Sequence, residues 1–120
     1  MAINSTGTSA RGRMQREFAI VASTTAGDET VEVVAAPGAG FRIVVMSVHL
    51  NVGAVASLTL RSDTTALHGP WAGTATVRDM IWVGDGFGLM ACDENKDLDL
   101  NISAAATVGG IVSYVVEAVP

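Results

Sequence analysis

Polar oxygen-bearing side chains recur at every second position from residue 93 to residue 99, a spacing that suits a hard cation. The residues at positions 1, 3, 5 and 7 of this loop are Asp93, Asn95, Asp97 and Asp99. A calcium loop of this kind also needs glycine at position 6 and a bidentate glutamate at position 12. This chain has Leu98 and Ala104 there. We therefore interpret the segment as a solvated polar turn and predict no metal site and no cofactor.

Residues for nucleophilic or zinc-assisted catalysis are scarce. The two histidines, His49 and His68, have no Glu or Cys at ligand spacing, whereas a zinc site takes three or four such ligands. The one cysteine, Cys92, is followed by Asp93 and Glu94, which disfavour the thiolate. No G-x-S-x-G segment marks a strained nucleophile. We predict no catalytic residues and no enzymatic activity.

Large apolar side chains concentrate in one third of the chain, and three interpretations stay open. They are Trp71, Met80, Trp82, Phe87 and Met90. Such residues fill a core, are enriched at subunit contacts, or, for paired tryptophans, stack against a sugar.

The elements that must position these residues read as strands. From Glu17 onward apolar residues alternate with polar ones, and Gly, Pro, Asp or Asn clusters interrupt the pattern about every ten residues. No segment predicts a convincing helix. The predicted strands are 17–22, 29–36, 41–52, 56–62, 66–68, 87–91, 97–103 and 111–119, and 74–78 and 80–83 are further strand candidates. About eight strands in two antiparallel sheets predict an all-β, jelly-roll-like sandwich over residues 17–120, preceded by a flexible arm over residues 1–16.

The strand at 41–52 is apolar on both sides at its start. Strict alternation puts one set on the core face: Val44, Met46, Val48, Leu50 and Val52. The opposite face then begins with Phe41, Ile43 and Val45 and becomes polar at Ser47, His49 and Asn51. A strand apolar on both sides is covered on both sides, here by a neighbouring subunit or by the arm. We therefore predict a subunit contact at Phe41, Ile43 and Val45, with Trp71 and Trp82.

Composition favours an oligomer. The chain has 120 residues, enough for one domain. Hydrophobic residues make up 49% of it and charged residues only 16%, which is more apolar surface than one small core absorbs. With one cysteine no intrachain disulfide forms, no segment predicts a membrane span, and the N-terminus lacks the apolar region of a secretory signal. We expect a protein that is cytoplasmic at synthesis.

Charge is unevenly distributed. Residues 1–20 carry a net charge of +2 and the remainder −7. An acidic body disfavours binding to nucleic acid or to an anionic membrane. The arm, with Arg11, Arg13 and Arg16, suits an acidic patch on a protein partner.

Two segments of the chain resemble the head decoration, or cement, proteins of tailed bacteriophages. They are VEVVAAPGAGFRIVVMSVHLNVGAVASLTLRSDTTALHGP (31–70) and DLDLNISAAATVGGIVSYVVEAV (97–119), with an APGAG turn followed by Arg42. The resemblance implies a homotrimer that binds the major capsid protein on the outer surface of the assembled head and stabilises it. It places the protein in the virion, after assembly in the host cytoplasm. The arm arginines are then the capsid-binding residues.

Two other functions share this fold class. One is a head-fibre or tail-tip module that binds host glycans, which requires exposed aromatic and polar side chains around a concave site. The other is a minor structural subunit at a head–tail or tail joint. An enzyme is the least supported class.

Overall fold

The computed structural model describes residues 15–72, 78–83 and 90–120, with residues 78–80, 82 and 83 described by their backbone alone. In these ranges the chain forms nine strands and no helix. They are β1 (Glu17–Thr25), β2 (Glu29–Val34), β3 (Phe41–Val52), β4 (Ser57–Ser62), β5 (Thr65–Ala72), β6 (Arg78–Val83), β7 (Met90–Ala91), β8 (Leu98–Ile102) and β9 (Ala106–Ala118). No helix in the described ranges is long and apolar enough to cross a membrane.

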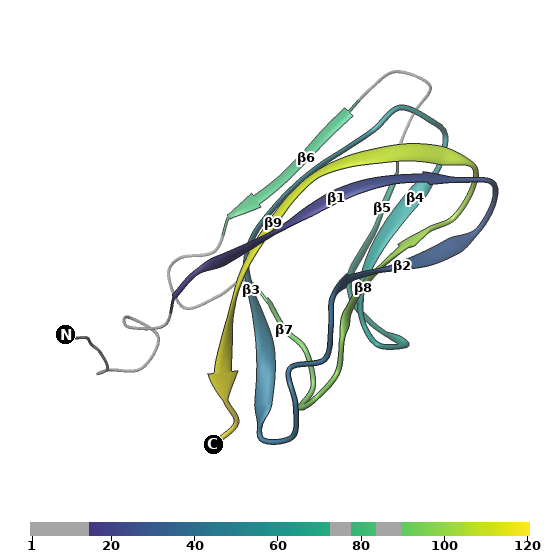
Figure 1. Ribbon diagram of the computed structural model, residues 1–120. Helices are drawn as coiled ribbons and strands as arrows, with labels where there is room; N and C mark the ends of the chain where they lie inside the picture. The colour runs from purple at the N-terminus through teal and green to yellow at the C-terminus, as the bar shows by residue number, and fades with distance from the viewer. Residues whose placement is uncertain (1–14, 73–77, 84–89) are drawn as a thin grey trace.

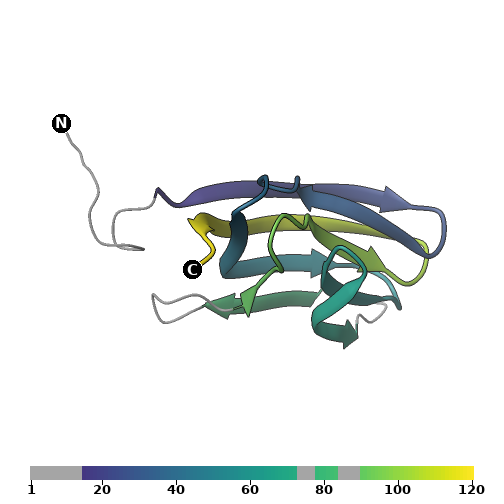
Figure 2. The ribbon, with the colours of Figure 1, turned by 90° about the horizontal axis from the view of Figure 1, so that it is seen from below.

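The strands form two antiparallel sheets packed as a sandwich (Figure 1). The first sheet has the order β1-β9-β3-β6, and the short β7 pairs with the start of β3; the second has the order β2-β8-β4-β5. Figure 2 shows the strands of the first sheet one beside the next. Consecutive strands such as β1 and β2, or β3 and β4, lie in opposite sheets. This is the strand order of a jelly roll, so the predicted fold is confirmed.

The core lies between the sheets and follows from the alternation of the strands. Its fully buried members include Leu58 and Leu60 on β4 and Leu98, Leu100 and Ile102 on β8. Side chains from β3 and β9 meet them from the first sheet. Fully burying a Leu or Ile side chain contributes about 1.5–3 kcal/mol, so this interleaved set is the main source of stability.

A β-bulge in β3 corrects the predicted facing of that strand. Val45 pairs with Tyr114 and Ser47 with Ser113, the next residue back along β9, which leaves Met46 as an extra residue. The bulge reverses the alternation. Ile43 and Val45 therefore belong to the main core, together with Val48 and Leu50 on the far side of the bulge.

Val44 and Met46 point to the opposite side of the sheet. There they form a second buried cluster with Val115, against which Ala91 packs. The doubly apolar start of β3 is thus covered on both sides, as expected. Both clusters consist of residues of the same chain, and on the second side β7 contributes to the cover.

Two predicted boundaries are wrong by four residues or more, and β1 also runs to Thr25 instead of ending at Ala22. Residues 69–72, expected as a loop, lie within β5, where Trp71 pairs with Leu58. Gly109 and Gly110, expected before the last strand, lie inside β9, which begins at Ala106. In both places pairing with a neighbouring strand overrides the weak local preference of Gly and Pro for turns.

Candidate interaction surface

Part of the outer face of the first sheet is free of charged side chains, namely residues 18–24 of β1, 107–113 of β9 and 47–51 of β3. Farther along β3 and β9 the same face carries the paired Arg42 and Glu117, and on β6 Asp79 is in register with Asn51. The pairing registers align Ile20, Ile111 and His49 in one row, and Phe18, Ser113 and Ser47 in the next. Ile81 on β6 extends the first row, because it pairs with His49. We call this surface the uncharged face. Its described residues are Phe18, Ile20, Ala22 and Thr24 of β1; Thr107, Gly109, Ile111 and Ser113 of β9; Ser47, His49 and Asn51 of β3; and Ile81.

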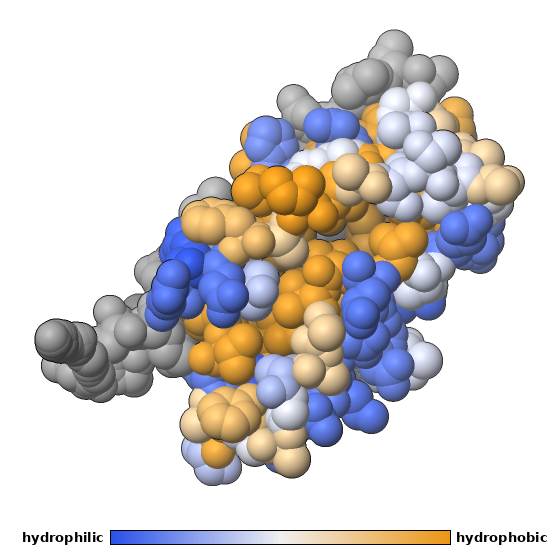
Figure 3. Space-filling model, viewed as in Figure 1, coloured by the Kyte–Doolittle hydropathy of each residue, from blue (hydrophilic) through white to orange (hydrophobic). Residues whose placement is uncertain are grey.

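Large apolar side chains are exposed to solvent at both edges of the uncharged face. Ile20 is 76% exposed and Phe18 is 62% exposed on β1, and Ile81 is 59% exposed on β6. Alternation places Val21, next to Ile20 on β1, and Val48, next to His49 on β3, in the core instead. Figure 3 looks at the edge of the sandwich and shows apolar residues along β1 and in the opening between β1 and β2. Isolated exposed apolar residues are ordinary, but a contiguous set marks a contact surface.

The hydroxyl groups on this face are paired across the strands. The Ser47 and Ser113 hydroxyls form a hydrogen bond across β3 and β9, and the Thr24 and Thr107 hydroxyls lie 3.2 Å apart across β1 and β9. Hydroxyls paired in this way lose less on removal from water than unpaired ones. The uncharged face is therefore suited to burial.

A small cleft lies where β1 and β2 approach each other at the open edge of the sandwich. It has a volume of about 170 Å³ and is lined by residues 20–23 and 31–33. Sites for small molecules usually enclose roughly 300–1,000 Å³. The cleft is too small for a typical organic ligand or for a sugar chain.

The structure changes the predicted subunit contact. Ile43 and Val45 have no exposed surface, because the bulge at Met46 turns them into the core of their own chain. Trp71 is 8% exposed and its ring stacks on His68, with the centroids 4.9 Å apart. These three residues have little or no surface to offer a second subunit. Phe41 is 45% exposed, so it remains a candidate for the subunit contact.

Other predicted residues lie partly or wholly beyond the described ranges. The Trp82 side chain lies outside them, although its backbone pairs with Val48. Arg11 and Arg13 lie outside them as well. Arg16 is exposed directly before β1, so the arm joins the body beside Phe18, at one end of the uncharged face.

Arg42, the basic residue after the APGAG turn, has a structural partner. Its Nε donates a hydrogen bond of 2.7 Å to Glu117 Oε2, and the two residues are directly paired across β3 and β9. Glu117 is nearly buried. An ion pair in this position fixes the register of the two longest strands.

The polar turn at residues 93–96 packs against the APGAG turn instead of standing free in solvent. Asn95 Oδ1 accepts a hydrogen bond of 2.9 Å from the Gly38 amide, and Glu94 Oε2 accepts one of 2.8 Å from the Gly40 amide. The Asn95 amide in turn donates to the Phe41 carbonyl. The Asn95 side chain is therefore occupied with a backbone contact and does not face Asp97 and Asp99.

Asp97 and Asp99 instead lie beside Asp63, a residue that the sequence pattern did not single out. One carboxylate oxygen from each of these three residues lies within 4.8 Å of the other two. Burial, followed by the neighbouring Asp97, raises the pKa of Asp99 to about 7. Asp63 is 34 positions away from Asp97, and only the pairing of β4 with β8 brings the two together.

Cys92 is buried next to this cluster. Its Sγ donates to the Asp97 carbonyl oxygen at 3.9 Å. Burial raises the pKa of the thiol to about 11, and Asp93 adds to the shift. The predicted direction is confirmed, with burial as the main cause. A neutral, buried thiol is a poor nucleophile.

No protein-family model matches this chain, and comparison with curated proteins and with solved structures gives no match.

Proposed function

We propose that this protein is a non-enzymatic structural protein that decorates the head of a tailed bacteriophage. In this proposal three copies associate as a homotrimer, bind the major capsid protein on the outer surface of the assembled shell, and stabilise the shell. The phage assignment is based on the resemblance of residues 31–70 and 97–119 to head decoration proteins. The association of subunits is based on the uncharged face.

The uncharged face is the observation that carries the proposal. Protein surfaces in water are normally interspersed with charge, and the cores of subunit interfaces are depleted of it. Here the exposed side chains of Phe18, Ile20 and Ile81 frame a patch without Asp, Glu, Lys or Arg among its described residues. The patch is bounded along β3 and β9 by the paired Arg42 and Glu117 on the same side of the sheet. A second copy of this chain is the occupant we infer, because closed symmetry is the usual way to cover a subunit's apolar surface.

The arm is the part of the chain that we assign to the capsid. It enters the body at Arg16, directly before β1. Arginine pairs bidentately with carboxylates, and a segment that orders on binding can cover a broad surface. The acidic body leaves the arm as the basic part of the molecule.

Three arms linked in one trimer explain how individually weak arm–capsid contacts give tight binding of the trimer to the shell. Once one arm is bound, the others bind as if at high local concentration, which raises avidity by roughly 10²–10⁴ when the geometry permits. A trimer that binds assembled shell and not free subunits stabilises the shell by mass action. No chemical step is needed.

The subunit contact is tested by mass measurement and one matched pair of variants. The wild-type chain should sediment at three times its 12.3 kDa. Ile20→Lys should shift the mass toward that of a single chain, because it places a charge on the uncharged face. Val55→Lys, which replaces a 75% exposed apolar residue in the β3–β4 loop, should leave the mass unchanged. A wild-type mass of one chain would refute the oligomer.

The capsid assignment is tested by mixing the protein with undecorated heads of tailed phages and imaging the particles by electron microscopy. Added density at threefold or quasi-threefold positions is the expected result. Binding restricted to the head–tail joint would contradict decoration and favour a minor joint subunit. Binding to a glycan array without binding to heads would favour a host-recognition module.

A further inference from the structure

Three carboxylates converge at the end of the second sheet, where the β4–β5 turn meets the start of β8. Asp97 and Asp99 are two residues apart and project from the same side of the chain, away from the core residue Leu98. The Asp63 amide donates a hydrogen bond of 3.0 Å to the Asp97 carbonyl oxygen. This bond continues the β4–β8 ladder one step beyond the pair Ser62 and Leu98, so Asp63 and Asp97 face each other across the strands.

Asp99 supplies a second observation that points to a ligand. The residue is only 8% exposed. Its Oδ1 atom is shielded from solvent, and it has no hydrogen-bond donor among the described residues. A buried carboxylate oxygen without a donor is strongly unfavourable. Asp99 contributes one carboxylate oxygen to the group of three that lie within 4.8 Å of one another, so this buried carboxylate belongs to the cluster.

The surrounding charges neutralise the cluster only in part. Glu32, a fourth carboxylate, is directly paired with Asp99 from β2. Arg61 is paired with Asp99 from β4, but no ion pair joins those two residues in the described part of the chain. Lys96 Nζ lies 3.9 Å from Asp63 Oδ2, and both side chains are about half exposed. Like charges directly opposite each other in a sheet are destabilising.

We propose that Asp63, Asp97 and Asp99 form a binding site for a divalent cation of the size of Ca²⁺. Calcium binds oxygens at about 2.3–2.6 Å, so two ligands on opposite sides of the ion lie up to about 5 Å apart; the corresponding limit for Mg²⁺ is about 4.2 Å. One oxygen of each of the three carboxylates lies within 4.8 Å of the other two, which is inside the limit for Ca²⁺. An irregular, partly hydrated site also suits the flexible coordination of Ca²⁺ better than the strict octahedron of Mg²⁺. Water completes the coordination on the exposed side, next to Asp63.

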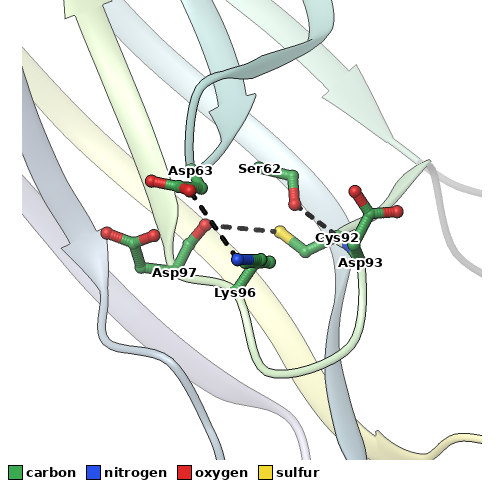
Figure 4. A network of polar contacts seen from close by, with 6 residues as sticks. All are labelled: Ser62, Asp63, Cys92, Asp93, Lys96 and Asp97. Carbon is green, nitrogen blue, oxygen red and sulfur yellow. Dashed lines mark hydrogen bonds and ion pairs between the residues drawn. The ribbon is translucent and has the colours of Figure 1, made fainter.

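This site differs from the calcium loop considered for residues 93–99. Figure 4 shows Asp63, Asp97 and Lys96 together, while the Asp93 carboxylate lies on the other side of the loop. Asn95 is occupied with the Gly38 amide. The ligands therefore come from two elements of the sheet, and a bound ion fastens the β4–β5 turn to β8.

Thermal unfolding of the full chain tests the site. The protein is freed of metal at pH 7.5 and melted in about 5 mM CaCl2, in MgCl2, or in NaCl of equal ionic strength. Weak calcium sites have Kd values of roughly 10⁻⁴–10⁻³ M, so about 5 mM CaCl2 should raise Tm by roughly 4–9 °C over NaCl. MgCl2 should raise it by less.

Three isosteric variants locate the effect. Asp63→Asn and Asp99→Asn should each lose most of the calcium-dependent shift, and Asp93→Asn should keep it. Calcium titration calorimetry on the same proteins gives a readout independent of unfolding, with heat of binding in the wild type and in Asp93→Asn only. An equal Tm in CaCl2 and NaCl, an undiminished shift in Asp99→Asn, or an equal shift in MgCl2 would overturn the proposal.

Discussion

Gly110 of β9 crosses the His49 carbonyl of β3 so closely that a Cβ atom on Gly110 would lie 2.0 Å from that oxygen. Its φ of +147° is also a conformation that side-chain-bearing residues rarely adopt. The close approach occurs under the uncharged face, between the two longest strands of the sandwich. Glycine at this position therefore lets β3 and β9 pair along nearly their whole length.

We expect Gly110→Ala to destabilise the fold by about 3 kcal/mol or more, because backbone atoms of both strands must move and the φ becomes strained. Gly27→Ala is the control, since a Cβ there meets no atom within 4 Å. Urea unfolding followed by tryptophan fluorescence measures both. Equal stability of the two variants would show that the strands separate easily at this crossing.

Ile43→Ala separates a core role from an interface role. Ile43 has no exposed surface, so truncation should lower the free energy of unfolding by about 2–5 kcal/mol. The oligomeric mass of the folded protein should not change. A dissociated but equally stable Ile43→Ala protein would restore this residue to the subunit contact.

The sequence predicted the jelly roll well, because alternation and turn residues are local signals. It misjudged the start of β3, because one extra residue at Met46 reverses every later side chain and leaves no mark in the composition. The sequence shows that Phe18, Ile20 and Ala22 alternate along one strand with no charged residue among them. It does not show that these residues share a surface with Ile81, because the strands that lie beside one another depend on the strand order of the sheet.

The carboxylate cluster was only half predictable. Asp97 and Asp99 stand out by their spacing, which also suggested the wrong companions, Asp93 and Asn95. Asp63 resembles any turn residue, and it has a φ of +56°, which Asp tolerates. Its place beside Asp97 follows from long-range pairing of β4 with β8, for which a single sequence gives no signal.

Cys92 should resist thiol reagents in the folded protein. With a pKa of about 11 instead of the ordinary 9.0, roughly one thiol in a thousand is ionised at pH 8, and the side chain is buried. Reaction with a chromogenic disulfide should be slow at pH 8, accelerate as the pH rises toward the pKa, and become rapid in denaturant. Complete reaction of the native protein within seconds at pH 8 would contradict the buried, neutral thiol.

Deletion of residues 2–16 should separate assembly from capsid binding. β1 begins at Glu17, so the truncated chain keeps all the strands that the structure describes and every described residue of the uncharged face. We expect an unchanged oligomeric mass and the loss of binding to undecorated heads in a sedimentation assay. Full binding by the truncated protein would place the capsid contact on the body of the sandwich.

Salt separates the charge of the arm from its mere presence. If Arg11, Arg13 and Arg16 bind capsid carboxylates near the surface, binding should weaken sharply from 50 to 500 mM NaCl, since the Debye length falls from roughly 14 to 4 Å. Arg13→Gln should weaken binding at low salt, and its effect is multiplied because three arms bind together. Lys96→Gln removes the same charge from the body and should bind as the wild type does. Equal losses in the two variants would mean that net charge, and not the arm, governs the attraction.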